Sequence, residues 1–149
     1  MKLLITITLS LLISTSSFTG KVIRITDGDT IVILTENNEQ VKIRLEGIDC
    51  PEHDQDFGTR AKQATSELCF NKEVRIEKSG VDKYGRTLGF VYVGDICVNK
   101  ELLKQGMAWH YKYFNKDLEM AKLEAEAKKA KIGLWSQPNP VAPWDFRRK

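Results

Sequence analysis

The chain has 149 residues, of which 42% are hydrophobic and 29% charged, and its formal net charge is +3. This length suits one domain with its own core, and the composition is that of an ordinary soluble globular protein. The small basic excess tolerates a polyanionic partner without requiring one, so charge by itself assigns no function.

The amino terminus has the features of a secretory signal peptide, predicted over residues 1–19. A single basic residue, Lys2, precedes an apolar stretch over residues 3–13 and small residues over 14–17. The apolar stretch is shorter than the roughly 20 residues that a permanent bilayer anchor needs. An amino-terminal strand or an uncleaved membrane tether is the alternative. We therefore expect a secreted or periplasmic protein that has no stable membrane association after cleavage.

The domain expected over residues 20–136 begins with strands. Apolar and β-branched patterns predict these strands over residues 21–26, 30–35, 41–45, 74–76 and 88–92. Residues 36–39 contain two asparagines, which tolerate a positive φ, and this predicts a hairpin turn.

Helical patterns dominate the second half of the chain, after one helix predicted between strands over residues 59–70. A short helix is expected to have Asn99 as its cap and to stop at Gly106. The Ala-, Glu- and Lys-rich segment 117–131 predicts a third helix, which Gly133 ends.

Residues 137–149 follow as an expected extended tail in which Trp144 is an aromatic anchor. Five short strands with one inserted helix and trailing helices predict an α+β fold, a five-stranded OB-fold β-barrel with about three α-helices. Barrels of this type often bind oligonucleotides or oligosaccharides.

Three cysteines in an exported chain allow one disulfide and leave one thiol. Cys69 and Cys97 fall at the ends of predicted elements and are one candidate pair, but the pairing among Cys50, Cys69 and Cys97 stays open. The spacing contains no CxxC pair, which argues against a zinc cluster.

Three carboxylates stand beside turn signals in the strand-rich half. Asp29 follows Gly28 at the start of a strand, and Asp49 and Glu52 follow the exit of another. A helix through this second pair is disfavoured because Pro51 pushes its preceding residue out of the α region. Aspartates from neighbouring strand ends suit Ca²⁺, which takes oxygen ligands. Asp29 taken alone is equally well explained as an ordinary turn residue.

Two arginines are predicted at or near the same barrel rim. Arg44 alternates with apolar residues, and Arg86 follows Gly85, which permits a tight turn. Each one alone is explained as a surface cation or half of an ion pair. Together with the three carboxylates they form a set suited to metal-assisted attack on a phosphate, in which guanidiniums hold the phosphate oxygens.

These segments resemble those of the staphylococcal nuclease (thermonuclease) family, which are secreted Ca²⁺-dependent nucleases built on an OB barrel. The resemblance runs from about residue 21 to residue 135. It rests on the order and spacing of Gly28-Asp29-Thr30, Arg44, Ile48-Asp49, Pro51-Glu52, Asp82-Lys83-Tyr84-Gly85-Arg86, Lys104-Gln105-Gly106-Met107-Ala108 and Gly133-Leu134-Trp135. Residues 138–144 resemble an extension of many bacterial members.

The resemblance implies that Asp29 and Asp49 bind Ca²⁺, together with the backbone carbonyl of Cys50. The best-known member has threonine at this last position, but any residue supplies a carbonyl. Glu52 is implied as the general base that activates water. The loop after Glu52 differs in length from that member, which leaves substrate preference open.

The resemblance also implies that Arg44 and Arg86 bind the scissile phosphate. Residues matching or near positions that line the nucleotide pocket are Lys83, Tyr84, Tyr111 and Tyr113.

We therefore expect a secreted, Ca²⁺-dependent, sugar-nonspecific endonuclease that hydrolyses DNA and RNA and leaves 3′-phosphates. Single-stranded or frayed substrates are favoured because tyrosines on a shallow rim can stack exposed bases, and a monomer is expected. One alternative is a noncatalytic nucleic-acid-binding OB-fold module. Another is a Ca²⁺-dependent sugar- or protein-binding barrel, which explains the acids but gives Arg44 and Arg86 no joint role.

Overall fold

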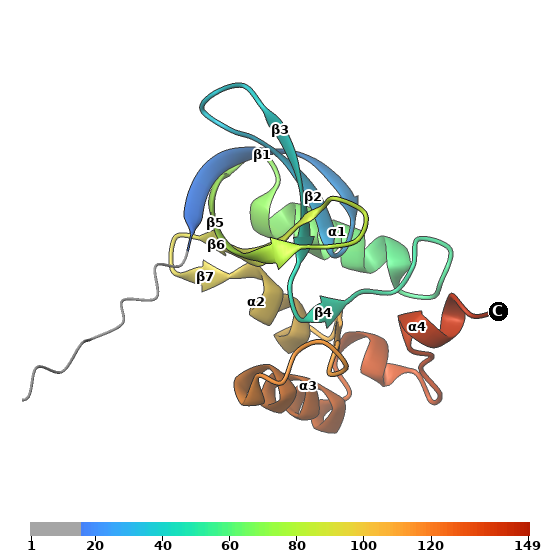
Figure 1. Ribbon diagram of the computed structural model, residues 1–149. Coiled ribbons are helices and arrows are strands. Elements are labelled where there is room, and N and C mark those ends of the chain that lie inside the picture. Colours follow the sequence, from blue (N-terminus) through green and yellow to red (C-terminus); the bar gives the residue numbers. More distant parts are fainter. Residues whose placement is uncertain (1–15) are drawn as a thin grey trace, which may run out of the picture.

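The computed structural model describes residues 16–149, so most of the predicted leader lies outside the described residues (Figure 1). The first strand, β1 (Ser17–Asp27), begins inside the segment predicted as leader. Ser17 pairs with Glu77 of β5, which makes the end of that segment part of the barrel wall. Across residues 16–149, no helix is long and apolar enough to cross a bilayer.

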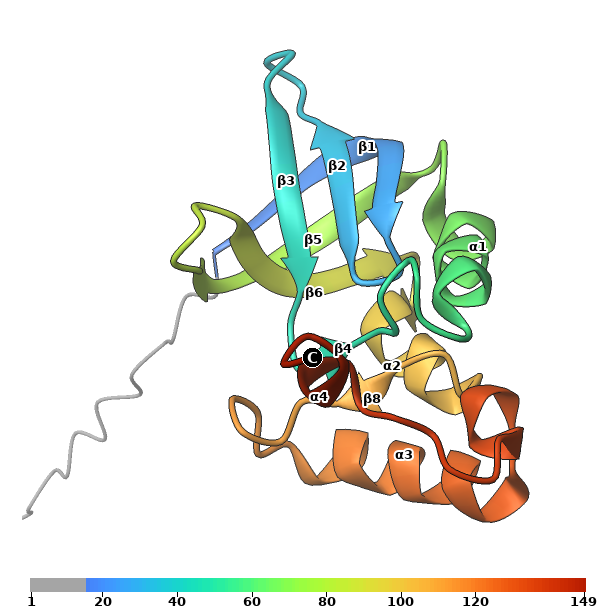
Figure 2. The ribbon, with the colours of Figure 1, turned by 90° about the vertical axis from the view of Figure 1, so that its right-hand side faces the viewer.

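Five strands close into a small barrel. They are β1, β2 (Thr30–Leu34), β3 (Gln40–Leu45), β5 (Glu73–Val81) and β6 (Thr87–Val93). Neighbours run antiparallel in the order β3-β2-β1-β5-β6, and parallel pairing of β3 with β6 closes the ring (Figure 2). Apolar side chains that alternate along the strands fill the interior, among them Val22, Ile33, Ile43, Ile76 and Val91. The predicted five-stranded OB barrel is confirmed.

Three strands of two residues each escape sequence prediction, because so short a segment shows no alternation. They are β4 (Ile48–Asp49), β7 (Ile96–Cys97) and β8 (Trp109–His110). β7 extends the sheet beside β6, whereas β4 and β8 pair with each other. This second pairing ties the chain leaving β3 to the helical half of the protein.

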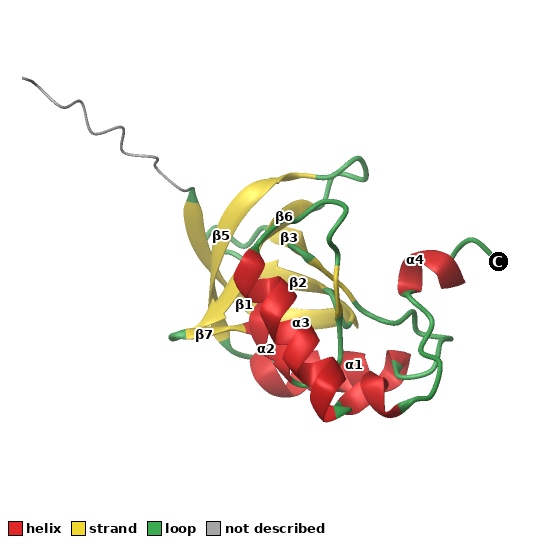
Figure 3. Cartoon of the chain, turned by 90° about the horizontal axis from the view of Figure 1, so that it is seen from below, coloured by secondary structure: helices red, strands yellow, loops and turns green. Residues whose placement is uncertain are grey.

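The three predicted helices are present as α1 (Gly58–Cys69), α2 (Val98–Lys104) and α3 (Leu118–Ala130). A 3₁₀ turn, η1 (Gly133–Ser136), follows α3. α1 packs against β1 and α2, and α2 packs against α3, so the helices gather on one side of the barrel (Figure 3). The third helix begins after Asp117, whose side chain accepts hydrogen bonds from two backbone amides, and it ends in Lys131 at φ 53° rather than at Gly133.

The prediction that Asn99 caps the second helix is wrong. α2 begins one residue earlier, and Asn99 is buried. Its Oδ1 accepts a hydrogen bond from the Val91 amide at 3.0 Å, and its Nδ2 donates to the Glu46 carbonyl at 2.9 Å. The asparagine therefore joins the helix to two barrel segments, because buried backbone groups near it need polar partners.

The carboxyl-terminal tail is not wholly extended as predicted. Pro143–Phe146 forms a short helix, α4, with proline in its first turn, where the missing amide costs nothing. The segment folds back toward β4, so that the last residues lie beside the chain that leaves β3 (Figures 1 and 2).

All three cysteines are free thiols, so the disulfide that the sequence allows is not formed, and neither is its candidate pair, Cys69 with Cys97. Cys50 and Cys69 are buried, and Cys97 is partly buried. Burial raises the pKa of Cys69 to about 12 and holds that of Cys50 well above its usual range.

We expect Cys50 and Cys69 to resist alkylation at about pH 8 while the protein is folded, because the reactive thiolate is scarce and shielded. Unfolding in denaturant without reductant should make all three cysteines reactive, and mass spectrometry counts the labels. Recovery of a single labelled cysteine would instead reveal a disulfide.

Candidate functional site

Asp29 is held in the turn between β1 and β2. Its Oδ2 accepts a hydrogen bond from the Cys50 amide at 2.8 Å, and its Oδ1 accepts one from the Thr30 hydroxyl at 3.2 Å. Gly28 is required beside it, because a Cβ there would stand 2.9 Å from the Cβ of Ala61 and from Cys50 Sγ. Close packing of this turn against α1 thus brings Asp29 to the chain after β4.

Asp49 ends β4 and is 1% exposed. It lies opposite Trp109 in the β4–β8 pair, which fixes its backbone. Gly47, at φ +76°, allows the turn that leads from β3 into β4. A tight turn and a two-residue strand therefore place this carboxylate at the barrel rim.

Arg44 joins the two aspartates. It lies on β3 opposite Thr30, and its Nη2 is 3.5 Å from Asp29 Oδ2 and 3.4 Å from Asp49 Oδ1. Its Nη1 donates to the carbonyls of Leu45 at 2.7 Å and Ile48 at 2.8 Å. Burial by itself lowers the pKa of Arg44, but the two carboxylates outweigh burial and raise it. The guanidinium is therefore a permanent positive charge.

Glu52 stands on the loop after β4 and faces the same space. Its amide donates to Gln55 Oε1 at 3.1 Å, and a Cβ at Gly58 would overlap its carbonyl oxygen, so α1 starts in direct contact with this loop. Arg147 Nη1 is 2.6 Å from Glu52 Oε1 and 3.2 Å from Asp49 Oδ1. One guanidinium thus links Glu52 to Asp49.

Arg86 does not join this cluster. The pairing of Ile43 with Thr87 brings the start of β6 beside β3, but Arg86 Nε is 2.6 Å from Asp82 Oδ2. Although partial burial raises the pKa of Asp82, hydrogen bonds from Arg86 and Tyr84 lower it on balance. The arginine lines a shallow depression together with Lys42, Tyr84 and Gly85.

The predicted nucleotide-pocket residues form two groups. On the β5–β6 hairpin, Tyr84 is 71% exposed and Lys83 Nζ lies 5.1 Å from its ring centre. After β8, the rings of Tyr111 and Tyr113 meet edge to face at 6.3 Å. Tyr111 is also stacked on Trp144, with ring centres 5.3 Å apart and planes 4° from parallel.

Burial makes the charged forms of two carboxylates at this rim less favourable. Burial raises the pKa of Asp49 although Arg147 and Arg44 lower it, and burial followed by the charges of Asp29 and Glu52 raises the pKa of Asp27. Deprotonated carboxylates held so close favour a bound cation. At Asp49 the nearest positive charges are the guanidiniums of Arg147 and Arg44.

The rim offers oxygen donors of the kind that a hard cation takes, but only part of a complete metal site. Among residues 16–149, no group of three or more His, Cys, Asp or Glu side chains is arranged to hold a metal. Asp29 and Asp49 supply carboxylate oxygens, and the remaining oxygens of a Ca²⁺ site would come from the backbone and water. Neither imidazole faces them, because His53 is exposed beside Asp54 and His110 Nε2 is 2.9 Å from Asn115 Oδ1.

Arg147 is the site residue that sequence reasoning missed. In the sequence it belongs to the basic end at residues 147–149 and has no catalytic motif around it. Its one signal is a spacing of three from Trp144, which puts both side chains one helical turn apart. Hydrogen bonding to Asp49 raises the pKa of Arg147, and a hydrogen bond to Glu52 raises it further. Partial burial acts in the opposite direction but is outweighed.

Comparison with known proteins matches residues 42–137 to the family described as staphylococcal nuclease homologues. A micrococcal nuclease of Shigella flexneri is 43% identical over 144 residues, which cover 89% of this chain and 82% of that protein. An uncharacterized endonuclease of Haemophilus influenzae is 42% identical over 131 residues, covering 88% and 74%. A probable staphylococcal-like nuclease of Oryza sativa subsp. japonica is 40% identical over 107 residues, covering 72% of this chain and 28% of that protein. The chain therefore belongs to the staphylococcal nuclease family.

Proposed function

We propose that this protein is a nuclease that hydrolyses phosphodiester bonds of nucleic acids. The observation that carries the proposal is the meeting of Asp29 and Asp49 at Arg44 on one barrel rim, with Glu52 linked to Asp49 through Arg147. Membership of a family whose relatives are named as nucleases supports the same reaction.

We infer that the nuclease depends on Ca²⁺ held by Asp29, Asp49 and the backbone carbonyl of Cys50. The Cys50 amide bonds to Asp29, so the backbone of this residue already lies beside that carboxylate. When bound, Ca²⁺ would oppose the negative charge that develops on the phosphate. The oxygen-rich, imidazole-free surroundings favour this ion over zinc or copper.

The reacting groups then have separate roles. Glu52 accepts the proton of the attacking water as general base, because its carboxylate is partly exposed at the edge of the cluster. Arg44 is held rigidly by two carbonyls and stabilises charge on the phosphate oxygens. Arg86 joins from the hairpin by exchanging its Asp82 partner for phosphate, since an arginine binds either oxyanion in the same forked manner.

The substrates proposed are DNA and RNA, cut without sugar preference and with 3′-phosphates left on the products. Single-stranded or frayed segments suit the site because the side chains of Tyr84 and Tyr113 are exposed and tyrosine rings can stack bases. Lys83 adds a positive charge beside the first of these rings. We further propose that the protein acts as a monomer outside the cytoplasm, after removal of its leader and without stable membrane association.

The calcium requirement is tested by incubating the purified protein with single-stranded DNA in the presence of Ca²⁺ or of a chelator. Cleavage is expected with Ca²⁺ and should fall to background under chelation, because the phosphate charge is then no longer opposed by the metal. Gel analysis of the products measures both. Unchanged cleavage under chelation contradicts the calcium mechanism, and tight binding without cleavage identifies a noncatalytic binding module instead.

A further inference from the structure

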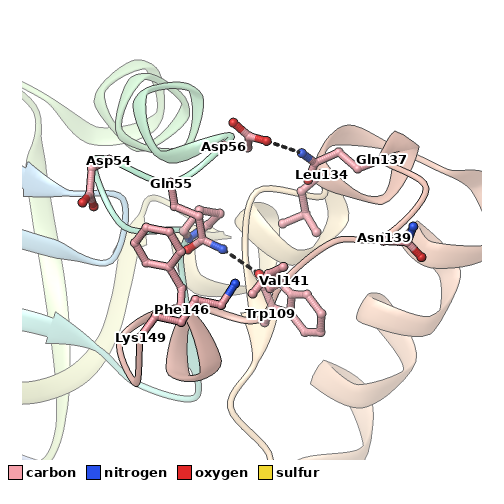
Figure 4. A pocket seen from close by; sticks show the side chains of 11 residues that line it. Asp54, Gln55, Asp56, Trp109, Leu134, Gln137, Asn139, Val141, Phe146 and Lys149 are labelled. Atoms are coloured by element: carbon pink, nitrogen blue, oxygen red, sulfur yellow. Dashed lines mark hydrogen bonds between the residues drawn. The ribbon is translucent and has the colours of Figure 1, made fainter.

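The carboxyl-terminal tail, residues 137–149, lies over the loop that carries Glu52. The Gln55 side chain donates to the Val141 carbonyl at 2.6 Å, and the Gln137 side chain donates to Asp56 Oδ2 at 3.3 Å (Figure 4). Ala142 and Pro143 are buried. These contacts deliver α4 to the rim where the carboxylates meet.

Arg147 of the tail occupies the position that a cation needs at this site. Its Nη2 is 2.8 Å from Asp49 Oδ2, and its Nη1 contacts both Asp49 and Glu52. The bonds engage a proposed metal ligand and the proposed base at once. While they last, Asp49 has fewer free oxygens for Ca²⁺, and a cation screens Glu52 from the water it would deprotonate.

Trp144 of the same tail covers the ring of Tyr111, one of the tyrosines expected at or near the nucleotide pocket. It lies parallel to Tyr111 at 5.3 Å and meets Trp109 and Tyr113 edge to face at 5.5 Å and 5.9 Å. A stacked indole uses the ring face that a nucleobase would use. The short segment from Trp144 to Arg147 therefore covers both a tyrosine ring and Asp49, the proposed metal ligand.

The tail is attached in a way that permits release. The Arg147 side chain is 41% exposed. An open pocket lies between the tail and the Glu52 loop, lined among others by Gln55, Trp109 and Phe146 (Figure 4). The side chain of its partner Asp49 is only 2% exposed, but no tail residue belongs to the apolar cluster inside the barrel. A cation that competes for Asp49 can therefore displace Arg147 without disturbing the barrel core.

We propose that the tail is a tethered competitor that closes the nuclease site, with Arg147 in place of the metal ion and Trp144 in place of a base. The inference rests on the proposed function for its biological meaning. Metal binding and tail docking then compete for Asp49. Docking of the tail lowers the affinity for the metal, and bound metal disfavours docking of the tail by the same factor. Calcium and nucleic acid together open the site.

The test is calcium titration calorimetry on the purified protein without nucleic acid. R147Q should bind Ca²⁺ on the order of 10-fold more tightly than the parent, because a charge-assisted competitor has been removed. W144A should shift affinity in the same direction although it removes no charge, since it loosens the tail. R148Q is the matched control: it removes an adjacent positive charge whose ion pair is a 3.8 Å contact with Asp145, and its affinity should stay within about twofold of the parent.

Thermal unfolding of each variant in chelator verifies that the barrel is intact. Unchanged or weaker calcium binding by R147Q overturns the proposal, as does an equal gain in R148Q, which would reveal a general charge effect. A gain in R147Q without one in W144A also overturns it, because the tail as a unit would not be competing. No calcium binding in any protein likewise overturns it. Failure of the proposed function appears separately, as absence of DNA cleavage at saturating Ca²⁺.

Discussion

Replacing Glu52 by glutamine is expected to lower the rate of phosphodiester cleavage by about 10²–10⁴-fold, the usual contribution of a general base. Glutamine has nearly the same shape and keeps an acceptor oxygen for Arg147, which now bonds to Glu52 at 2.6 Å. It cannot take a proton from water at neutral pH. The initial rate of oligonucleotide cleavage at saturating Ca²⁺ measures the loss.

Asp54→Asn is the matched control for this substitution. Asp54 stands on the same loop, but its side chain is 62% exposed and its ion-pair contact is with His53 at 3.7 Å. It should retain the parental rate. Full activity in E52Q would remove Glu52 from the role of base, and an equal loss in both variants would point to a disturbed loop instead.

Replacing Arg44 by alanine is expected to damage both catalysis and stability. The cleavage rate should fall by about 10²–10³-fold, by analogy with the loss of one oxyanion-stabilising donor. The free energy of unfolding in chelator should fall by about 3–5 kcal/mol, because Asp29 and Asp49 are left buried without this partner. Adding Ca²⁺ should recover part of the stability but little of the rate.

Denaturant unfolding with and without Ca²⁺ separates the two effects of R44A. Arg75→Ala is the control, because Arg75 is 44% exposed and pairs with Glu77 on the outer surface of β5. Its stability and rate should both stay close to the parent. If R44A unfolds like the parent in chelator, the guanidinium does not neutralise the buried aspartates, and the proposed arrangement of charges is wrong.

Much of the fold follows from local patterns. Apolar residues at alternating positions, such as Ile43 and Leu45 around Arg44, predict a strand with one face inward, and the observed β3 has this arrangement. The placement of Asp29 and Asp49 near a barrel rim was also predictable, since both follow turn signals beside strands, but their meeting was not. Two-residue strands such as β4 were not, because they depend on a partner distant in the chain.

The choice of partner accounts for the differences from prediction, at long range for Asn99 and within one hairpin for Arg86. Asn99 has the residue type of a helix cap. In the fold it is buried instead and hydrogen-bonds to the backbone of Val91 and of Glu46, which links the helix to the barrel. Arg86 carries the charge expected of a phosphate ligand, yet Asp82, four residues earlier, holds it on the hairpin. Neither partner choice is encoded in spacing alone, because each depends on which polar groups the fold brings within reach of the side chain.

By itself the sequence determined the barrel and the positions of its main helices, because periodicity and turn chemistry act over a few residues. It also indicated which carboxylates and arginines lie near the barrel rim. The tertiary structure decided which of those groups meet. It joined Arg44 to Asp29 and Asp49, and it brought Arg147 across 95 positions of chain to Glu52. Which side chains pair depends on their distance and burial in the folded protein, not on their spacing in the sequence. For this reason Arg147, in a basic tail without a recognisable motif, is part of the site.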